Sequence, residues 1–228
     1  MNQLFFHHDI EQLKNLPNGV LPIRLYGMGD KSLQIAHIGN MVLDRVRRLG
    51  VELNNQVMDF LTIAMAVTAA DTFILRKDTA NGWCRSFSIT LPLCQPDIWQ
   101  ANKVHLEQIL HFLSGDIWQF DFQAGGQLPP QPYKLSGRTK LVDLRNKDCV
   151  CLFSGGLDSL IGVVDLLELG HSPVLVSHSY KGDKSRQQAI IQQLNRNGYI
   201  NQFSQFNAIA QPHSNNGKAL KSQCEPEV

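Results

Sequence analysis

The chain has 228 residues, of which 43% are hydrophobic and 18% are charged, a composition that allows a buried core and excludes a wholly disordered chain. With 21 basic and 20 acidic residues, the net charge of +1 gives no electrostatic signature of a nucleic-acid-binding protein. At about 150 residues per domain, the length predicts one complete domain and part of another, or one large domain.

The N-terminus has no basic region followed by an apolar stretch and a cleavage site, so no secretion signal is expected. No apolar run approaches the ~20 residues that a membrane-spanning helix needs. The number of cysteines is odd and they contain no CxxC pair, so neither a disulfide framework nor a four-cysteine zinc site is supported. These observations predict a cytoplasmic protein without a membrane anchor.

The first half of the chain mixes strand and helix patterns. Apolar alternation predicts a strand over 85–93, with Phe87, Ile89 and Leu91 on one face. Further strands are expected at 3–7, 20–26 and 117–122, and helices at 40–49, 54–71 and 96–113. Gly50 and Gly115 are placed to end two of these helices, and Asn54 or Asn55 can cap the start of the helix at 54–71. We therefore expect residues 1–122 to form a mixed α+β domain.

Residues 123–148 are rich in Gly, Pro and polar side chains, and we interpret them as a linker. The second half then opens with a continuous apolar run at 149–153, typical of a parallel strand buried on both faces. A glycine-rich turn, an apolar helix at 160–169 and a second apolar strand at 173–177 follow. This order predicts an α/β fold, the start of a doubly wound parallel sheet over 149–210, with a disordered tail at 211–228.

The glycine-rich turn reads Ser154-Gly155-Gly156-Leu157-Asp158-Ser159 and joins a strand to a helix. The first N–H groups of a helix have no partner within it and form the positive end of its dipole, so an anion is stabilised there. Glycines let the backbone approach such an anion closely, and the two serines add hydroxyl donors. The turn lacks the lysine of a Walker A loop and the GxGxxG spacing of a dinucleotide site. The pattern therefore predicts a phosphate or pyrophosphate site, the alternative being a glycine-rich turn without a ligand.

The SGGxDS motif resembles the PP-loop of the N-type ATP pyrophosphatases. The resemblance implies a HUP-like nucleotide-binding domain that holds ATP and Mg²⁺ and adenylates a carboxylate-like or amide-like acceptor, releasing pyrophosphate. It implies that Ser154, Gly155, Gly156, Asp158 and Ser159 bind phosphate, that Asp158 and Ser159 are catalytic, and that Asp158 holds Mg²⁺. Ser177 and His178, at the end of the next strand, are candidates for contacts with the nucleoside. His178 is also typical of a strand end with no ligand role.

Within this family, the stretch from Ser154 to Leu167 and the length of the region before it are most similar to the 7-cyano-7-deazaguanine synthase-like component of the Qat anti-phage defence system. That resemblance implies partners among the other subunits of such a system and no membrane or nucleic-acid partner. The cysteine cluster that binds zinc in the biosynthetic deazaguanine enzymes is not matched, because only Cys224 follows the loop.

Few residues follow the loop compared with the several βα units that a doubly wound domain requires. We therefore expect a truncated or split family member, the alternative being an intact small variant. An incomplete sheet should leave apolar side chains exposed on its strands, namely Val150, Leu152, Val174 and Val176. For the function, the alternatives are a non-catalytic interaction subunit or an inactive fragment of the enzyme.

Three other groups of residues have a possible functional role in addition to a structural one. Asp71, Arg76, Trp83 and Arg85 fit either a recognition surface or, as we favour, a buried Asp–Arg pair beneath an aromatic side chain. The basic cluster at 45–48 is typical of a solvated helix face. His7 and His8 are expected on opposite faces of a strand, which makes them a poor metal pair.

Overall fold

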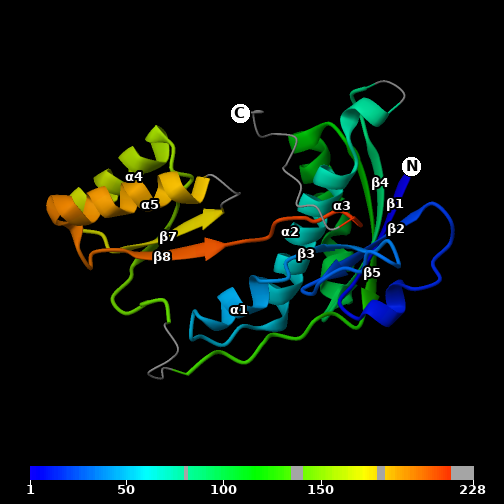
Figure 1. Ribbon diagram of the computed structural model, residues 1–228, viewed down its shortest axis with the longest axis horizontal. Coiled ribbons are helices and arrows are strands. Elements are labelled where there is room, and N and C mark those ends of the chain that lie inside the picture. The colour runs from blue at the N-terminus through cyan, green and yellow to red at the C-terminus, as the bar shows by residue number, and fades with distance from the viewer. Residues whose placement is uncertain (80–81, 135–140, 179–182, 217–228) are drawn as a thin grey trace. The chain divides into compact units, whose positions relative to one another are not determined.

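The computed structural model describes residues 1–79, 82–134, 141–178 and 183–216 (Figure 1). The chain forms two compact units. Unit 1 comprises Met1–Met41, Leu53–Pro130 and Ala210–Val228, and unit 2 comprises Val42–Glu52 and Gln131–Ile209. Both units are therefore assembled from separate stretches of chain, unlike the contiguous domains expected with boundaries at 122 and 148. None of the helices in the described ranges has the length and apolar character needed to cross a bilayer.

Unit 1 is built on one five-stranded sheet. Its strands are β1 (Asn2–His7), β2 (Val20–Leu25), β3 (Ala36–Ile38), β4 (Ser86–Leu93) and β5 (Ile117–Ala124). Its helices are α2 (Asn55–Phe73) and α3 (Pro96–Ser114), with short 3-10 turns η1 (Ile10–Leu13) and η2 (Arg76–Asp78). The strand order is β3-β2-β1-β4-β5 and every pair is parallel. The α/β class is confirmed, whereas the mixed α+β arrangement expected for 1–122 is wrong, because this sheet has the order of a Rossmann-like fold.

The two faces of this sheet differ in polarity. Phe87, Ile89 and Leu91 are fully buried, as the alternation in β4 predicted, and α2 and α3 pack on β4 and β5. The register places Ser88 and Thr90 on the opposite face, in line with the odd-numbered residues of β1. Sequence alternation thus distinguishes a buried face from a polar one, although parallel sheets are usually covered on both.

The ends of the helices follow their local sequence. The Asn54 side chain accepts a hydrogen bond from the N–H of Val57 at 2.9 Å, which caps α2 as expected. Pro96 stands in the first turn of α3, where its missing N–H costs nothing. Gly115 ends α3 with a φ of 72°, a conformation that favours glycine.

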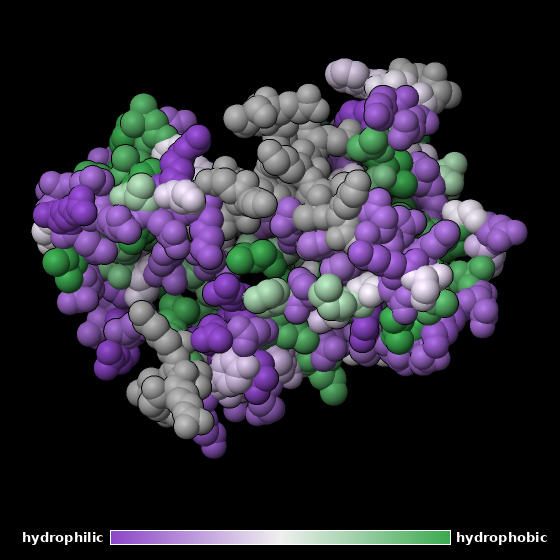
Figure 2. Space-filling view, in the orientation of Figure 1, coloured by the Kyte–Doolittle hydropathy of each residue, from purple (hydrophilic) through white to green (hydrophobic). Residues whose placement is uncertain are grey.

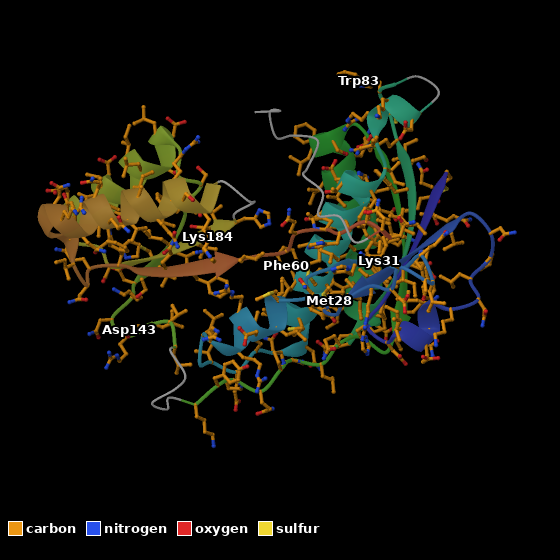
Figure 3. The ribbon with its side chains drawn as sticks, viewed as in Figure 1. Met28, Lys31, Phe60, Trp83, Asp143 and Lys184 are labelled. Atoms are coloured by element: carbon orange, nitrogen blue, oxygen red, sulfur yellow. The ribbon has the colours of Figure 1, made fainter. Side chains whose placement is uncertain are left out.

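A buried ion-pair cluster lies at the start of β4. Arg85 is fully buried and its guanidinium contacts Asp71 at 2.7 Å and Asp116 at 2.6 Å. Arg76 joins the cluster through Asp116 at 3.0 Å. The expected buried Asp–Arg pair is therefore confirmed, but the aromatic cover is not: Trp83 is 74% exposed and lies at the tip of the connection before β4 (Figure 3).

The described part of the expected C-terminal tail is ordered against unit 1. His213 exchanges backbone hydrogen bonds of 2.8 and 3.0 Å with His37, the middle residue of β3, and the two rings stack with centroids 4.5 Å apart. The expectation of disorder from residue 211 is therefore wrong for 211–216, because pairing with a strand satisfies backbone groups that a polar sequence alone does not. Residues 217–228 lie outside the described ranges.

Burial of His37 makes the stability of unit 1 dependent on pH. Burial is the main cause that lowers the pKa of His37 to about 4 from an ordinary 6.5, with further electrostatic contributions from the neighbouring His213 and Arg24. The unfolded chain therefore binds the proton first, so stability is full above pH 6.5 and falls as the pH drops towards 4, by up to about 3 kcal/mol. Chemical denaturation followed by tryptophan fluorescence at pH 7 and pH 4.5 measures this loss. Exchanging exposed His105 for Gln should leave the loss unchanged, and a loss that persists in His37→Gln would contradict the assignment to His37.

Unit 2 is built on a three-stranded parallel sheet in the order β6-β7-β8. Its strands are β6 (Cys149–Leu152), β7 (Pro173–His178) and β8 (Ser204–Ala208). Its helices are α1 (Val42–Arg47), α4 (Leu157–Glu168) and α5 (Asp183–Leu194), followed by the irregular turn η3 (Asn195–Tyr199). The predicted strand–turn–helix–strand order is confirmed, and β8 follows as a third strand within the range 149–210 expected for this sheet.

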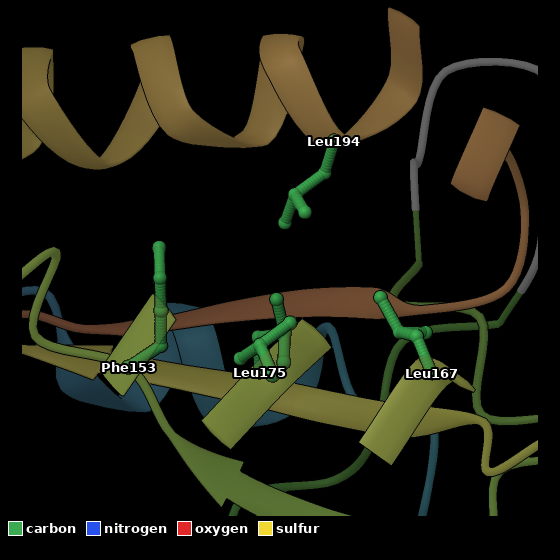
Figure 4. Close-up of a cluster of buried hydrophobic side chains, with 5 residues drawn as sticks. Phe153, Leu167, Leu175 and Leu194 are labelled. Carbon is green, nitrogen blue, oxygen red and sulfur yellow. The ribbon is translucent and has the colours of Figure 1, made fainter. Parts of the chain in front are cut away.

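The core of unit 2 lies between this sheet and the two helices α4 and α5. Phe153 and Leu175 come from the sheet, Leu167 from α4 and Leu194 from α5, and each is at most 5% exposed (Figure 4). On the opposite side of the sheet, α1 contacts β8. This second layer is anchored by Tyr133, whose hydroxyl donates to Asp44 at 2.9 Å, so part of the segment expected to be a linker packs within unit 2.

Strand β6 forms an edge of the sheet, since within the described residues it pairs only with β7. Val150 and Leu152 are 69% and 78% exposed, as expected. The same expectation for Val174 is wrong, because β7 is the central strand and Val174 is buried there. Hydrophobic side chains also reach the surface over α4, where Leu157 and Ile161 are exposed (Figure 2).

Candidate functional site

The SGGxDS motif lies between the carboxyl end of β6 and the start of α4. Phe153 continues the strand, with its N–H bonded to the Val176 carbonyl at 2.8 Å and its side chain buried. Ser154, Gly155 and Gly156 make the turn, and α4 begins at Leu157, three residues before the expected start. The strand–turn–helix context that the motif requires is therefore present.

The two serines close the turn on itself. The N–H of Gly156 donates to Ser154 Oγ at 3.2 Å, Ser154 Oγ donates to Ser159 Oγ at 3.1 Å, and Ser159 Oγ donates to the Gly156 carbonyl at 2.9 Å. Both hydroxyl protons are thus used inside the turn. In this arrangement the two serines fix the shape of the loop, and their expected contacts with a ligand stay a prediction.

The first turn of α4 is left open to an anion. Gly156 is the residue before the helix, and no side chain caps the helix from that position. The first N–H groups of α4 therefore point outward without a capping acceptor, at the positive end of a twelve-residue helix. Asp158 lies exposed in this turn, where its carboxylate can meet a cation that accompanies a bound phosphate.

Substitution of Gly155 by any other residue would strain the loop. Its φ of +85° lies in the left-handed region. A Cβ added here would stand 2.9 Å from Cγ of Gln187, which is closer than real Cβ atoms come to their neighbours. The tight turn thus depends on glycine both for its backbone angle and for its packing against α5.

Gln187 on α5 is a site residue that the sequence analysis missed. It is 1% exposed, and its Nε2 donates to the carbonyls of Ser154 at 3.1 Å and His178 at 3.3 Å. One amide therefore ties the loop after β6 to the end of β7. No motif marks this glutamine, because it belongs to a polar helical segment, KSRQQ, that is typical of an exposed face.

Several polar atoms beneath α5 are buried without a hydrogen-bond partner in the described structure. They are Gln187 Oε1, Ser177 Oγ, Asn207 Oδ1 and Gln205 Nε2. Ser177 is fully buried and lies in register with Asn207 of β8, near the carboxyl ends of both strands. Since buried polar atoms are almost always hydrogen-bonded, this group is a place where a ligand or water would be accommodated. Asn207 and Gln205 were not predicted.

The two residues expected to contact the nucleoside are placed differently. Ser177 lies beneath the surface, whereas His178 is exposed at the end of β7. Gln187 brings both strand ends to the glycine loop through its two hydrogen bonds. The structure therefore gathers Ser177, His178 and the loop at one edge of the sheet.

A group of three potential metal ligands lies at the opposite end of β6. Atoms of Asp148, Cys149 and His171 are within 4.8 Å of one another, and it is the one such group among the described residues. A hydrogen bond from the Ser172 N–H, together with His171, lowers the pKa of Asp148 to about 2. Burial and the Asp148 carboxylate raise the pKa of Cys149, so its thiolate is disfavoured. These contacts tie the starts of β6 and β7 together and lie away from the glycine loop.

Unit 1 offers no comparable phosphate site at the corresponding helix. The start of α3 follows β4, next to the point where the strand order reverses, which is where ligands of such sheets commonly bind. There the Asp59 carboxylate, 1% exposed, accepts hydrogen bonds from the N–H groups of Cys94 at 2.7 Å and Gln95 at 2.9 Å. The chain's own carboxylate therefore occupies the place that an anion would take.

Comparisons with protein-family models, curated proteins and solved structures found no match to this chain. The resemblance to the PP-loop family consequently depends on the SGGxDS motif and its strand–turn–helix setting.

Proposed function

We propose that unit 2 binds ATP with Mg²⁺ at the loop from Ser154 to Ser159. The observation that carries the proposal is the uncapped start of α4 directly behind a turn whose Gly155 has no room for a Cβ. Such a helix start binds phosphate through its backbone N–H groups and its dipole. The buried, unpartnered polar atoms of Ser177 and Asn207 at the neighbouring strand ends support a ligand that extends beyond the phosphates.

Each residue has a defined role in this proposal. The N–H groups of the first turn of α4 hold the terminal phosphates, and Ser154 and Ser159 keep the loop in shape. Asp158 supplies one carboxylate to Mg²⁺, which proteins usually bind through one or two carboxylates together with phosphate oxygens and water. Ser177 and His178, at the end of β7, would contact the nucleoside. The bound metal would neutralise phosphate charge.

The reaction proposed on the motif resemblance is adenylation of a carboxylate-like or amide-like acceptor, with release of pyrophosphate. In-line attack on a phosphorus atom depends on positioning and charge stabilisation more than on a strong base. Backbone N–H groups, one carboxylate and a rigid loop suit that requirement. The finer proposal, a 7-cyano-7-deazaguanine synthase-like role in anti-phage defence, rests on the same resemblance.

Exchange of Asp158 for Asn should abolish formation of AMP and pyrophosphate and weaken binding of ATP in the presence of Mg²⁺. The exposed side chain makes no structural contact that the change would break, so the free energy of unfolding should stay nearly constant. Isothermal titration with ATP and an assay for pyrophosphate measure both effects. Asp165→Asn, an exposed carboxylate two turns further along α4, is the matched control. Equal ATP binding and turnover in Asp158→Asn and the unchanged chain would refute the role of Asp158.

A second candidate function is that of a non-catalytic interaction subunit. It is favoured by the edge strand β6, whose Val150 and Leu152 side chains are largely exposed. Unpaired strand edges with apolar side chains are places where other chains associate. Failure of the unchanged chain to bind ATP, together with recovery of a stable complex that Leu152→Lys abolishes, would favour this candidate over the enzyme.

A further inference from the structure

A row of basic side chains crosses the carboxyl ends of three neighbouring strands in unit 1. His7 at the end of β1 lies in register with Arg24 of β2, and Arg24 lies in register with His37 of β3. The bridge from His37 to His213 extends the row by one residue from a distant segment of the same chain. Residues in register on parallel strands point to the same side of the sheet, so the four side chains share one face.

This face is the polar one, opposite the side on which α2 and α3 pack. The connection from β1 to β2 contains only the short turn η1, and the described segment between β2 and β3 contains no helix. Met28 and Lys31, labelled in Figure 3, mark that second segment. In parallel α/β sheets, ligands bind outside the carboxyl ends of the strands, at the point where the strand order reverses. That point lies between β1 and β4, so the row begins beside it at His7 and extends from there to β3.

Arg24 is held rigidly at the centre of the row. Its Nε donates to the His8 carbonyl at 3.3 Å and its Nη1 to the Met28 carbonyl at 2.9 Å. Gly27 lies directly against the guanidinium, since a Cβ there would come within 2.6 Å of Nε. These contacts leave Nη2 without a hydrogen bond to any described residue, so a fixed cation presents one donor group to a ligand.

The flanking imidazoles supply further donors. His7 Nδ1 lies 3.0 Å from the Asp9 N–H and 3.2 Å from the Asp9 carbonyl oxygen, so Asp9 engages Nδ1 and leaves Nε2 as the ring nitrogen that faces a ligand. His37 is 3% exposed, yet its Nε2 has no hydrogen-bond partner in the described structure. His8 Nδ1 is likewise buried without a partner. Unsatisfied imidazole nitrogens on both sides of Arg24 are an independent sign that a ligand group is accommodated here.

The carboxylates near the row are engaged elsewhere. Asp9 accepts a hydrogen bond from the N–H of Glu11 at 3.0 Å and caps η1. Asp30 accepts hydrogen bonds from Ser32 and from the N–H of Leu33, which hold its pKa below the usual range. The local charge of the row is therefore positive and is not neutralised by a direct ion pair with Arg24 among the described residues.

We infer that the row formed by His7, Arg24, His37 and His213 binds the phosphate group of a small phosphorylated molecule. Strands are spaced by about 4.8 Å, so the imidazoles of His7 and His37 flank Arg24 within the reach of one phosphate. A phosphate monoester offers three acceptor oxygens and close to two negative charges, which matches several donors around one guanidinium better than a carboxylate does. The net charge of +1 argues against a polynucleotide as the ligand.

The inference is tested on the full chain by NMR of the histidine side chains during titration with inorganic phosphate at pH 7. The signals of His7, His37 and His213 should shift saturably, while that of exposed His105 on α3 should not. Arg24→Gln should weaken phosphate binding by about tenfold or more, the effect of losing one charge-assisted hydrogen bond. Lys103→Gln on α3 removes the same charge outside the row and should change the affinity by less than about twofold.

Three outcomes would overturn the inference: no shift of the row's signals in the unchanged chain, equal affinity in Arg24→Gln, or tighter binding of a duplex oligonucleotide than of phosphate at equal phosphate concentration. Tryptophan fluorescence verifies that Arg24→Gln is folded. If it is not, His213→Ala, which leaves the backbone contacts of Arg24 in place, decides the question by the loss of phosphate affinity. Asp158→Asn should leave these shifts unchanged. The phosphate site in unit 1 and the ATP site proposed at the loop of unit 2 can therefore be confirmed or refuted independently.

Discussion

Replacing Asp116 by Ala should reduce the free energy of unfolding of unit 1 by about 3–5 kcal/mol. Asp116 and Arg85 are both fully buried, and their closest side-chain atoms are 2.6 Å apart. Although burial alone would raise the pKa of Asp116, hydrogen bonds and charge from Arg85 lower it, so the carboxylate is ionised. Without it, the Arg85 guanidinium stays buried with Asp71 as its one remaining carboxylate partner.

Unfolding of unit 1 can be followed separately, because all three tryptophans of the chain, Trp83, Trp99 and Trp118, lie in it. Denaturant titrations monitored by tryptophan fluorescence therefore measure the predicted loss. Asp121→Ala, at an exposed position on the same strand β5, is the matched control and should change the stability by less than about 0.5 kcal/mol. A loss below about 1 kcal/mol in Asp116→Ala would show that solvent reaches Arg85 more easily than its burial indicates.

Much of the local structure was predictable because it depends on short patterns. The alternation of apolar residues predicted the buried face of β4, Asn54 predicted the start of α2, and Gly115 predicted the end of α3. Strand β3 was missed, since three residues are too few to show a period. The parallel arrangement of unit 1 was also missed, because pairing partners are chosen by tertiary packing and the connections between β1, β2 and β3 lack the helices that usually announce a parallel sheet.

The two units were also not predicted to be discontinuous, because tertiary packing between distant segments determines which stretches of chain belong together. The contacts of Tyr133 with Asp44 and Arg47 join segments more than eighty residues apart. His213 similarly pairs with His37 across most of the chain. His7 and His8, expected on opposite faces, instead stack with ring centroids 4.7 Å apart, because β1 ends at His7 and the alternation stops there. Local sequence carries no information on such pairings.

Part of the candidate site was predictable from the sequence and part was not. The glycine loop was found from six consecutive residues, whose chemistry is local to one helix start. Gln187, Asn207 and the row around Arg24 were not found, because each depends on the register of separate strands or on a side chain from another helix. Only the fold reveals that a polar residue in an ordinary helical sequence is buried against the loop.

Exchange of Gly155 for Ala should weaken binding of ATP in the presence of Mg²⁺ by at least about tenfold. A residue with a Cβ in the left-handed region costs about 1–2 kcal/mol, and here the Cβ would also press on Gln187 Cγ at 2.9 Å. Moving Gln187 weakens its hydrogen bonds to the Ser154 and His178 carbonyls, which position the loop against β7. The N–H groups at the start of α4 then lose the alignment on which phosphate binding depends.

The neighbouring glycine provides the matched comparison. Gly156 has a φ of −83°, which any residue adopts, and a Cβ there would meet Ser154 Oγ at an ordinary 3.5 Å. Gly156→Ala should therefore keep the ATP affinity within about threefold of the unchanged chain, a difference below 1 kcal/mol. Isothermal titration of both variants, with circular dichroism to verify folding, measures the contrast. Equal affinities in Gly155→Ala and Gly156→Ala would show that the geometry of this turn does not set phosphate binding, whereas absence of ATP binding in the unchanged chain would refute the proposed function itself.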